Sequence, residues 1–182
     1  MNRLDTYLFA VCIIFLLFKI IAVSLTNFDL FGDEAQYWIW SKKLDLGYYS
    51  KPPALPWLIA SVTLFFGQSF FVIKMIPVLI YCITAYVIFL LTLKLYKEKN
   101  FAIIVALSFF LMPAVSFSSF LLSTDILLIL FWSLSLLQTL ICIEKPKYIN
   151  FIMLGIFVGI AFLSKYAAIY FFICFVFFAF EK

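Results

Sequence analysis

Long apolar runs, separated by short charged segments, dominate the pattern of this chain. Runs such as residues 7–25 and 77–93 are apolar on every face, unlike the alternating segments of about 10 residues found in membrane barrels. A helix needs about 20 residues to cross a bilayer core of about 30 Å. The pattern therefore predicts membrane-spanning helices over about 7–25, 76–95, 101–118, 126–143, 151–163 and 166–180.

The segment between the first two predicted spans, residues 26–75, has a different pattern. Its stretch from Phe31 to Pro53, FGDEAQYWIWSKKLDLGYYSKPP, mixes acidic, aromatic and basic residues. Aromatic side chains gather at headgroup level, so we expect AQYWIW to form a helix along the membrane interface. The apolar run from Leu55 to Phe66 is short for a span, and we expect it to lie along the interface or to re-enter the membrane.

The remaining chain offers no sign of a second domain, so we treat residues 1–182 as one transmembrane module. Ser164 and Lys165 leave two alternatives open, because they can form a tight hairpin between two short spans or a break within one long segment.

Composition agrees with an all-α integral membrane protein, because 67% of the residues are hydrophobic and only 12% are charged. The 4 cysteines fall inside apolar runs and histidine is absent. These features argue against disulfides, a zinc site and a histidine base. The net charge of +4 comes from lysines scattered between spans, which gives no indication of nucleic-acid binding.

Basic residues in short connections are retained on the cytoplasmic side of a membrane. The short segments Lys94 to Lys99 and Glu144 to Lys147 are basic and would lie there. We therefore expect a multi-pass protein of the cytoplasmic (inner) membrane, with residues 26–75 forming a loop on the outer, periplasmic side.

Asp33 and Glu34 stand directly before the predicted interfacial helix. Neighbouring residues on a helix point about 100° apart, so at most one of these carboxylates reaches a given site. Asp33 has an alternative role as the N-cap of the helix, with Gln36 completing a capping box.

Two prolines, Pro52 and Pro53, hold the segment that carries Tyr48, Tyr49 and Lys51 in an extended conformation. Such a segment would present its phenols and its ammonium group in fixed positions, and we expect Tyr48 and Tyr49 to bind substrate. Lys51 either binds a phosphate or extends its ammonium group to the membrane interface.

Asp125 interrupts apolar sequence, where a lone carboxylate indicates a functional site or a cap for the helix beginning at Ile126. Lys165 is a further isolated charge, which binds substrate or extends to the interface. Together these residues suit a lipid that carries a phosphate: a carboxylate accepts a proton from an acceptor, and lysines stabilise the leaving phosphate. Carboxylates also bind hard cations, but we expect no metal and no cofactor.

The order of these motifs resembles the inverting membrane glycosyltransferases of the GT-C type, nearest the aminoarabinose transferase and protein mannosyltransferase group. The matching pieces, in chain order, are the Asp-Glu pair, the aromatic helix, Tyr-Tyr-Ser-Lys-Pro-Pro, Ser-Thr-Asp at 123–125, and Gly155, Gly159, Ser164 and Lys165. The resemblance implies transfer of a sugar from a polyprenyl-phosphate donor to a lipid or protein acceptor.

The resemblance also implies roles for individual residues. Asp33, accompanied by Glu34, matches the acid that activates the acceptor, and Asp125 matches a second acid of the site. Lys51 matches the lysine of the Lys-Pro-Pro loop, and Lys165 matches a basic position near the donor phosphate.

This group has about twice as many spans as the pattern predicts here. The resemblance therefore covers the N-terminal part of the family, with the C-terminal part absent or supplied by a partner chain. The alternative is a non-catalytic membrane scaffold or transport subunit derived from the same family.

Overall fold

The computed structural model describes residues 3–25 and 30–180. Residues 26–29, where the predicted outer loop begins, and residues 1, 2, 181 and 182 lie outside this part. All regular elements of the described part are helical, which confirms the all-α prediction. In chain order they are α1 (Arg3–Leu25), α2 (Gly32–Ser41), α3 (Ala54–Phe66), α4 (Phe70–Tyr96), α5 (Lys99–Leu111), α6 (Pro113–Ser118), α7 (Thr124–Glu144), α8 (Tyr148–Ser164), the 3₁₀ turn η1 (Tyr166–Ala168) and α9 (Ile169–Phe180).

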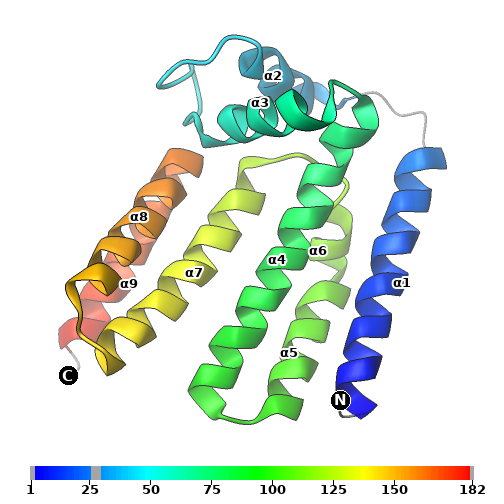
Figure 1. The fold of residues 1–182 in the computed structure, drawn as a ribbon. Helices are drawn as coiled ribbons and strands as arrows, with labels where there is room; N and C mark the ends of the chain where they lie inside the picture. Colours follow the sequence, from blue (N-terminus) through cyan, green and yellow to red (C-terminus); the bar gives the residue numbers. More distant parts are fainter. Residues whose placement is uncertain (1–2, 26–29, 181–182) are drawn as a thin grey trace.

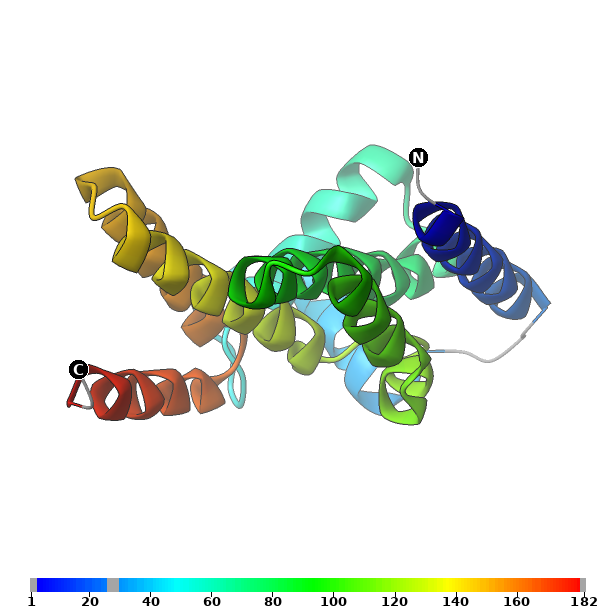
Figure 2. The same ribbon diagram turned by 90° about the horizontal axis from the view of Figure 1, so that it is seen from below.

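The helices form a bundle with a cap across one end. Helices α1, α4, α5, α7, α8 and α9 run along a common direction, and α2 and α3 lie across one end of them (Figure 1). Seen along the bundle, α1 and α9 lie on opposite sides (Figure 2). Helix α4 packs against α5 and α7, and α7 packs against α8. The two termini lie at the end away from α2 and α3.

Two of the described helices are long and apolar enough to cross a membrane. These are α4, with 27 residues, and α7, with 21 residues. The other apolar helical stretches are shorter, at 10–17 residues, and include Ile13–Leu25 of α1. The all-helical membrane bundle follows from these elements, while the number of spans stays a prediction.

The boundaries of two predicted spans differ from the observed helices. The predicted span 101–118 is wrong as a continuous helix, because α5 ends at Leu111 and α6 begins at Pro113. Met112 between them has a ψ of 128°, since a residue before proline avoids the helical region. Helix α4 begins at Phe70 rather than at 76, because the Ser69 side chain caps it.

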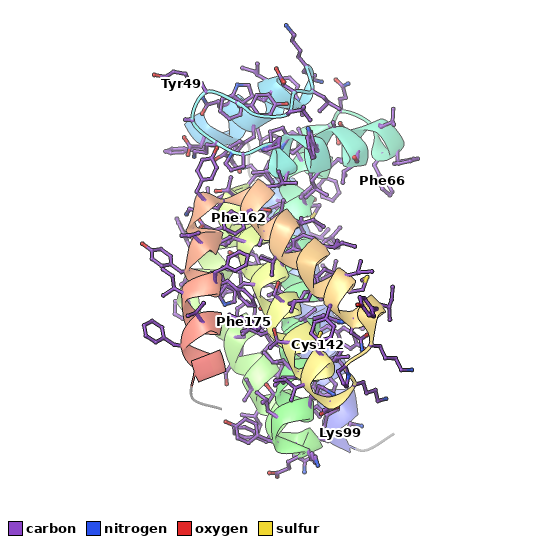
Figure 3. The ribbon with its side chains drawn as sticks, turned by 90° about the vertical axis from the view of Figure 1, so that its left-hand side faces the viewer. Tyr49, Phe66, Lys99, Cys142, Phe162 and Phe175 are labelled. Carbon is purple, nitrogen blue, oxygen red and sulfur yellow. The ribbon has the colours of Figure 1, made fainter. Side chains whose placement is uncertain are left out.

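The chain turns back on itself at the end of α8. Helix α8 ends at Ser164, and the short η1 turn leads into α9, which runs back toward the same end of the bundle and diverges from α8 with distance from the turn (Figures 1 and 3). The rings of Phe162 and Phe172 meet there, with centroids 5.6 Å apart. Of the two alternatives for Ser164 and Lys165, the structure therefore has the hairpin.

A buried apolar cluster holds the cap of α2 and α3 against the bundle. It joins side chains of α2, α3, α4 and the start of α7, among them Tyr37, Leu55, Ile59, Ile73, Ile76, Tyr81, Leu122 and Ile126. Burial of these side chains removes apolar area from water and lipid headgroups, which stabilises the contact. The cluster fixes the N-terminal ends of α2 and α7 close to each other, and the candidate site lies there.

Candidate functional site

Helix α2 begins without using Asp33 as its cap. The N-cap residue is Phe31, and its backbone N–H donates to Glu34 Oε2 at 2.9 Å. The capping alternative for Asp33 with Gln36 is therefore wrong. Asp33 lies in the first turn, where a negative charge is favourable, and its side chain is 70% exposed.

The loop after α2 folds back onto that helix. The Tyr48 ring stacks on Trp40 with centroids 4.7 Å apart. The Tyr48 hydroxyl donates to the carbonyl oxygens of Trp40 and Lys43, each at 3.1 Å. Because these contacts close the loop, the residues that follow Tyr48 return toward α2.

Lys51 makes two polar contacts with α2. Its Nζ donates to Asp33 Oδ2 at 2.9 Å and to the Tyr37 hydroxyl at 2.5 Å. Asp33 and Tyr37 lie one turn apart on the same face of the helix. The hydrogen bond with Tyr37 and then that with Asp33 raise the pKa of Lys51 above its usual 10.5, against the opposing effect of burial. Lys51 is therefore a cation at neutral pH.

A second ion pair joins α7 to the end of α8. Lys165 Nζ lies 2.6 Å from Asp125 Oδ1, and both side chains are about half exposed. Asp125 stands in the first turn of α7, and the N-cap residue is Ser123, so the capping alternative for Asp125 is also wrong. Its carboxylate is available to Lys165 instead.

Both ion pairs line one cavity of about 330 Å³. Its walls come from α2, the Lys51 loop, the start of α7 and the turn after α8, at the end of the bundle that α2 and α3 cover (Figure 1). Tyr37, Ser50, Thr124 and Tyr166 also line it. The cavity therefore combines two carboxylates, two ammonium groups and several hydroxyls.

The structure brings together four of the seven predicted site residues, Asp33, Lys51, Asp125 and Lys165. The other three, Glu34, Tyr48 and Tyr49, do not line the cavity. Glu34 is only 2% exposed and pairs with Lys74, and Tyr48 holds the loop closed. Tyr49 is fully exposed at the outer edge of the molecule and points away from the bundle (Figure 3).

Two tyrosines of the cavity were missed from the sequence. Tyr37 follows Asp33 by one helical turn, which is the spacing that places two side chains on one face. Tyr166 follows Lys165 directly and also lines the cavity. Helical periodicity could have indicated Tyr37. Tyr166 could not be predicted, because its position depends on the turn at the end of α8.

The arrangement supports acid–base and anion-binding chemistry. A carboxylate such as Asp33 accepts a proton, and the two ammonium groups attract a phosphate. Among the described residues, no group of three histidine, cysteine or acidic side chains is placed to hold a metal ion.

Comparisons with known proteins agree with this kind of site. A lipid A galacturonosyltransferase, RgtD, of Rhizobium johnstonii is 34% identical over 157 residues, which cover 86% of this chain and 33% of the relative. The undecaprenyl phosphate-alpha-4-amino-4-deoxy-L-arabinose arabinosyl transferase of Wigglesworthia glossinidia brevipalpis is 28% identical over 185 aligned positions, covering 90% of this chain and 32% of the relative. The chain thus spans about a third of the length of these curated relatives. No solved structure matches it significantly.

The family comparison covers most of the chain. The family described as dolichyl-phosphate-mannose-protein mannosyltransferase matches residues 50–182, which include Lys51, Asp125 and Lys165. This match and the two relatives confirm the resemblance to GT-C glycosyltransferases. The chain belongs to the dolichyl-phosphate-mannose-protein mannosyltransferase family.

Proposed function

We propose that this chain carries the reaction site of a glycosyltransferase that moves a sugar from a polyprenyl-phosphate donor to a lipid acceptor. The observation that supports it most is the cavity in which Asp33 and Asp125 each meet a lysine, at 2.9 and 2.6 Å. Each carboxylate holds an ammonium group in place until a phosphate competes for it. The names of both relatives describe sugar transferases, one acting on lipid A and the other using an undecaprenyl phosphate.

In this proposal the cavity faces the outer, periplasmic side of the cytoplasmic membrane. The connections at the opposite end of the bundle are short and basic, with Lys94, Lys97 and Lys99 around one of them and Lys145 and Lys147 in the other. Basic residues in short connections stay in the cytoplasm. The proposal also takes the chain to be multi-pass, with α4 and α7 as the two best-supported spans.

Asp33 acts as the general base of the transfer. Its Oδ accepts the proton of the acceptor hydroxyl or amine while that oxygen or nitrogen forms a bond to the anomeric carbon. The bond from the anomeric carbon to the phosphate oxygen breaks, and its electron pair leaves with the polyprenyl phosphate. The attack comes from the face opposite the phosphate, so the reaction inverts the configuration.

Lys51 and Lys165 bind the phosphate of the donor. The negative charge on the phosphate increases as the sugar leaves, so two fixed ammonium groups stabilise the transition state more than the bound donor. Asp125 orients Lys165, as Asp33 and Tyr37 orient Lys51. Tyr48 and Tyr49 have no part in this binding, because neither lines the cavity.

Further helices, of the same protein or of a partner chain, complete the donor site. We infer this because the chain spans about a third of the length of its relatives. The isoprenoid part of the donor and the acceptor then lie between the described helices and these additional ones.

The proposal is tested by donor binding and label transfer. The purified protein in liposomes is given a panel of radiolabelled undecaprenyl-phosphate sugars, with lipid A as acceptor, and compared with Asp33→Asn/Asp125→Asn. The matched control is Asp45→Asn, an exposed loop acid outside the cavity. We expect the wild-type protein to bind the donor saturably and to transfer its sugar. The double variant should lose this transfer, and the control should keep it. Absence of saturable binding, or transfer unchanged in the double variant, contradicts the proposal.

A further inference from the structure

Glu34 is a buried carboxylate that stands next to Asp33 but outside the cavity. Its side chain is only 2% exposed, and both of its oxygens accept from N–H groups. Oε2 lies 2.6 Å from Lys74 Nζ and 2.9 Å from the Phe31 N–H, and Oε1 lies 2.7 Å from the Leu122 N–H. A carboxylate held in this way has no route to an acceptor in the cavity.

Lys74 extends the same network into the bundle. It comes from α4, is 8% exposed, and its Nζ also donates to the Phe120 carbonyl oxygen at 3.3 Å. The Glu34–Lys74 pair therefore joins three segments: the start of α2, the outer end of α4, and the connection between α6 and α7. A buried charge without a partner is strongly unfavourable, so arrangements that separate these two groups are disfavoured.

One of the joined segments carries an acid of the cavity, and another leads directly to the second acid. Asp33 directly precedes Glu34 on α2. The Leu122 N–H, which donates to Glu34, lies just before α7. Asp125 lies three residues further on, in the first turn of that helix. The position of Asp33 relative to Asp125 thus depends on one buried carboxylate and its lysine.

We propose that Glu34 is a positioning residue, which through Lys74 and the Leu122 N–H fixes the separation of Asp33 and Asp125 across the cavity. Its effect on sugar transfer rests on the proposed function, whereas its effect on the distance between α2 and α7 does not. This assignment replaces the sequence-based expectation that Glu34 takes part in the reaction itself.

Three variants separate a positioning role from a reacting one. Glu34→Gln leaves Lys74 without its anion, Lys74→Met leaves Glu34 without its cation, and Glu34→Gln/Lys74→Met has neither buried charge. Because a misplacement of about 1 Å can cost on the order of 100-fold in rate, each single variant is expected to lose about that much transfer. The double variant also lacks the Glu34 carboxylate, but it is expected to recover most of the wild-type rate of transfer.

A distance measurement gives a readout that does not depend on activity. Nitroxide labels are placed at Ile39 on α2 and Leu136 on α7, two exposed positions, after replacement of the 4 native cysteines. Pulsed electron resonance then reports the distribution of distances between the helices. We expect one narrow distribution in the wild type and in the double variant, and broader ones in both single variants. Lys94→Met, which breaks an ion pair at the opposite end, is the matched control and leaves the distribution unchanged.

Each outcome decides the inference. Joint recovery of transfer and of a narrow distribution in the double variant supports it. A folded double variant with the wild-type distribution and no transfer overturns it, because the Glu34 carboxylate is then needed in the reaction. Unchanged distributions in both single variants overturn it as well. If the wild type transfers no sugar, the proposed function fails, and the distributions alone decide the positioning role.

Discussion

Lys51 Nζ lies 2.9 Å from Asp33 Oδ2, although 18 residues separate the two in the chain. The contact exists because Tyr48 closes the loop onto Trp40 and Lys43, which returns Lys51 to the face of α2 that carries Asp33 and Tyr37. An acid and a cation are thereby placed at one wall of the cavity, opposite a second such pair.

Replacement of Lys51 by methionine is expected to weaken donor binding. The variant removes an ammonium group from the cavity but keeps a side chain of similar length. A hydrogen bond to a charged group contributes about 1.5–3 kcal/mol, so the Kd for undecaprenyl phosphate should rise by roughly 10- to 100-fold. Equilibrium binding in liposomes measures it. Lys43→Met, on the exposed part of the same loop, should bind as the wild type does; equal losses in both would contradict a specific role for Lys51.

The pKa of Lys51 is expected to depend on Tyr37. The Tyr37 hydroxyl is the main cause that raises this pKa above 10.5 in the folded protein. Because the folded value is raised, the stabilisation is complete below about pH 10.5 and is lost as the pH rises through the folded pKa. Tyr37→Phe should lower the folded pKa of Lys51, so the stabilisation should be smaller and its loss, which still begins near pH 10.5, should be complete at a lower pH. A pH titration of the Lys51 side-chain resonance, assigned by its absence in Lys51→Met, checks this. An unchanged pKa in Tyr37→Phe would refute the assigned cause.

The Lys165–Asp125 pair is expected to matter for function more than for stability. Both side chains are about half exposed, so Lys165→Met should change the free energy of unfolding by less than about 1 kcal/mol. The loss of a charge that stabilises the leaving phosphate should nevertheless lower transfer on the order of 100-fold. Lys94→Met breaks the ion pair with Glu144 at the opposite end and is the control. Similar transfer in Lys165→Met and Lys94→Met would show that Lys165 lies outside the reaction.

Tyr48 is expected to stabilise the folded loop and not to bind the donor. Tyr48→Phe keeps the stacking on Trp40 but removes the hydroxyl that donates to the Trp40 and Lys43 carbonyl oxygens. The cost should be about 1 kcal/mol of folding free energy, read as a lower midpoint of thermal unfolding. Tyr49→Phe, at a fully exposed side chain, should leave the midpoint unchanged. A lower midpoint in Tyr49→Phe but not in Tyr48→Phe would show that Tyr49, and not Tyr48, stabilises the loop.

The sequence predicted the parts of the fold that depend on long apolar runs. Helices α4 and α7 follow from uninterrupted apolar sequence, and the helix over Ala54–Phe66 follows from a run too short to span. The break at Met112 was missed, because the surrounding residues are as apolar as the rest of the run. Pro113 was its only local signal.

The site was predictable in its charges but not in its orientations. Asp125 and Lys165 stood out because a charge in apolar sequence is costly. Asp33 and Lys51 stood out because they lie in the charged and aromatic segment between the first two predicted spans. The sequence allowed only one of Asp33 and Glu34 to face the cavity without saying which, since that depends on Lys74 and on the Leu122 N–H. Tyr48 was assigned to substrate because nothing local indicates that its hydroxyl meets the carbonyl oxygen of Trp40.

Single-turnover transfer by Asp33→Asn is the most direct test of Asp33 as the group that takes the acceptor proton. The asparagine keeps the size and a hydrogen-bond acceptor for Lys51 but is not a base, so donor bound in advance should stay bound while its sugar is not transferred. Asp45→Asn, measured in parallel, should transfer as the wild type does. We expect a donor Kd within a few-fold of the wild type and a loss of about 100-fold or more in the rate of transfer, roughly the range of general-base catalysis. Transfer at the wild-type rate from bound donor in Asp33→Asn would show that Asp33 is not the general base.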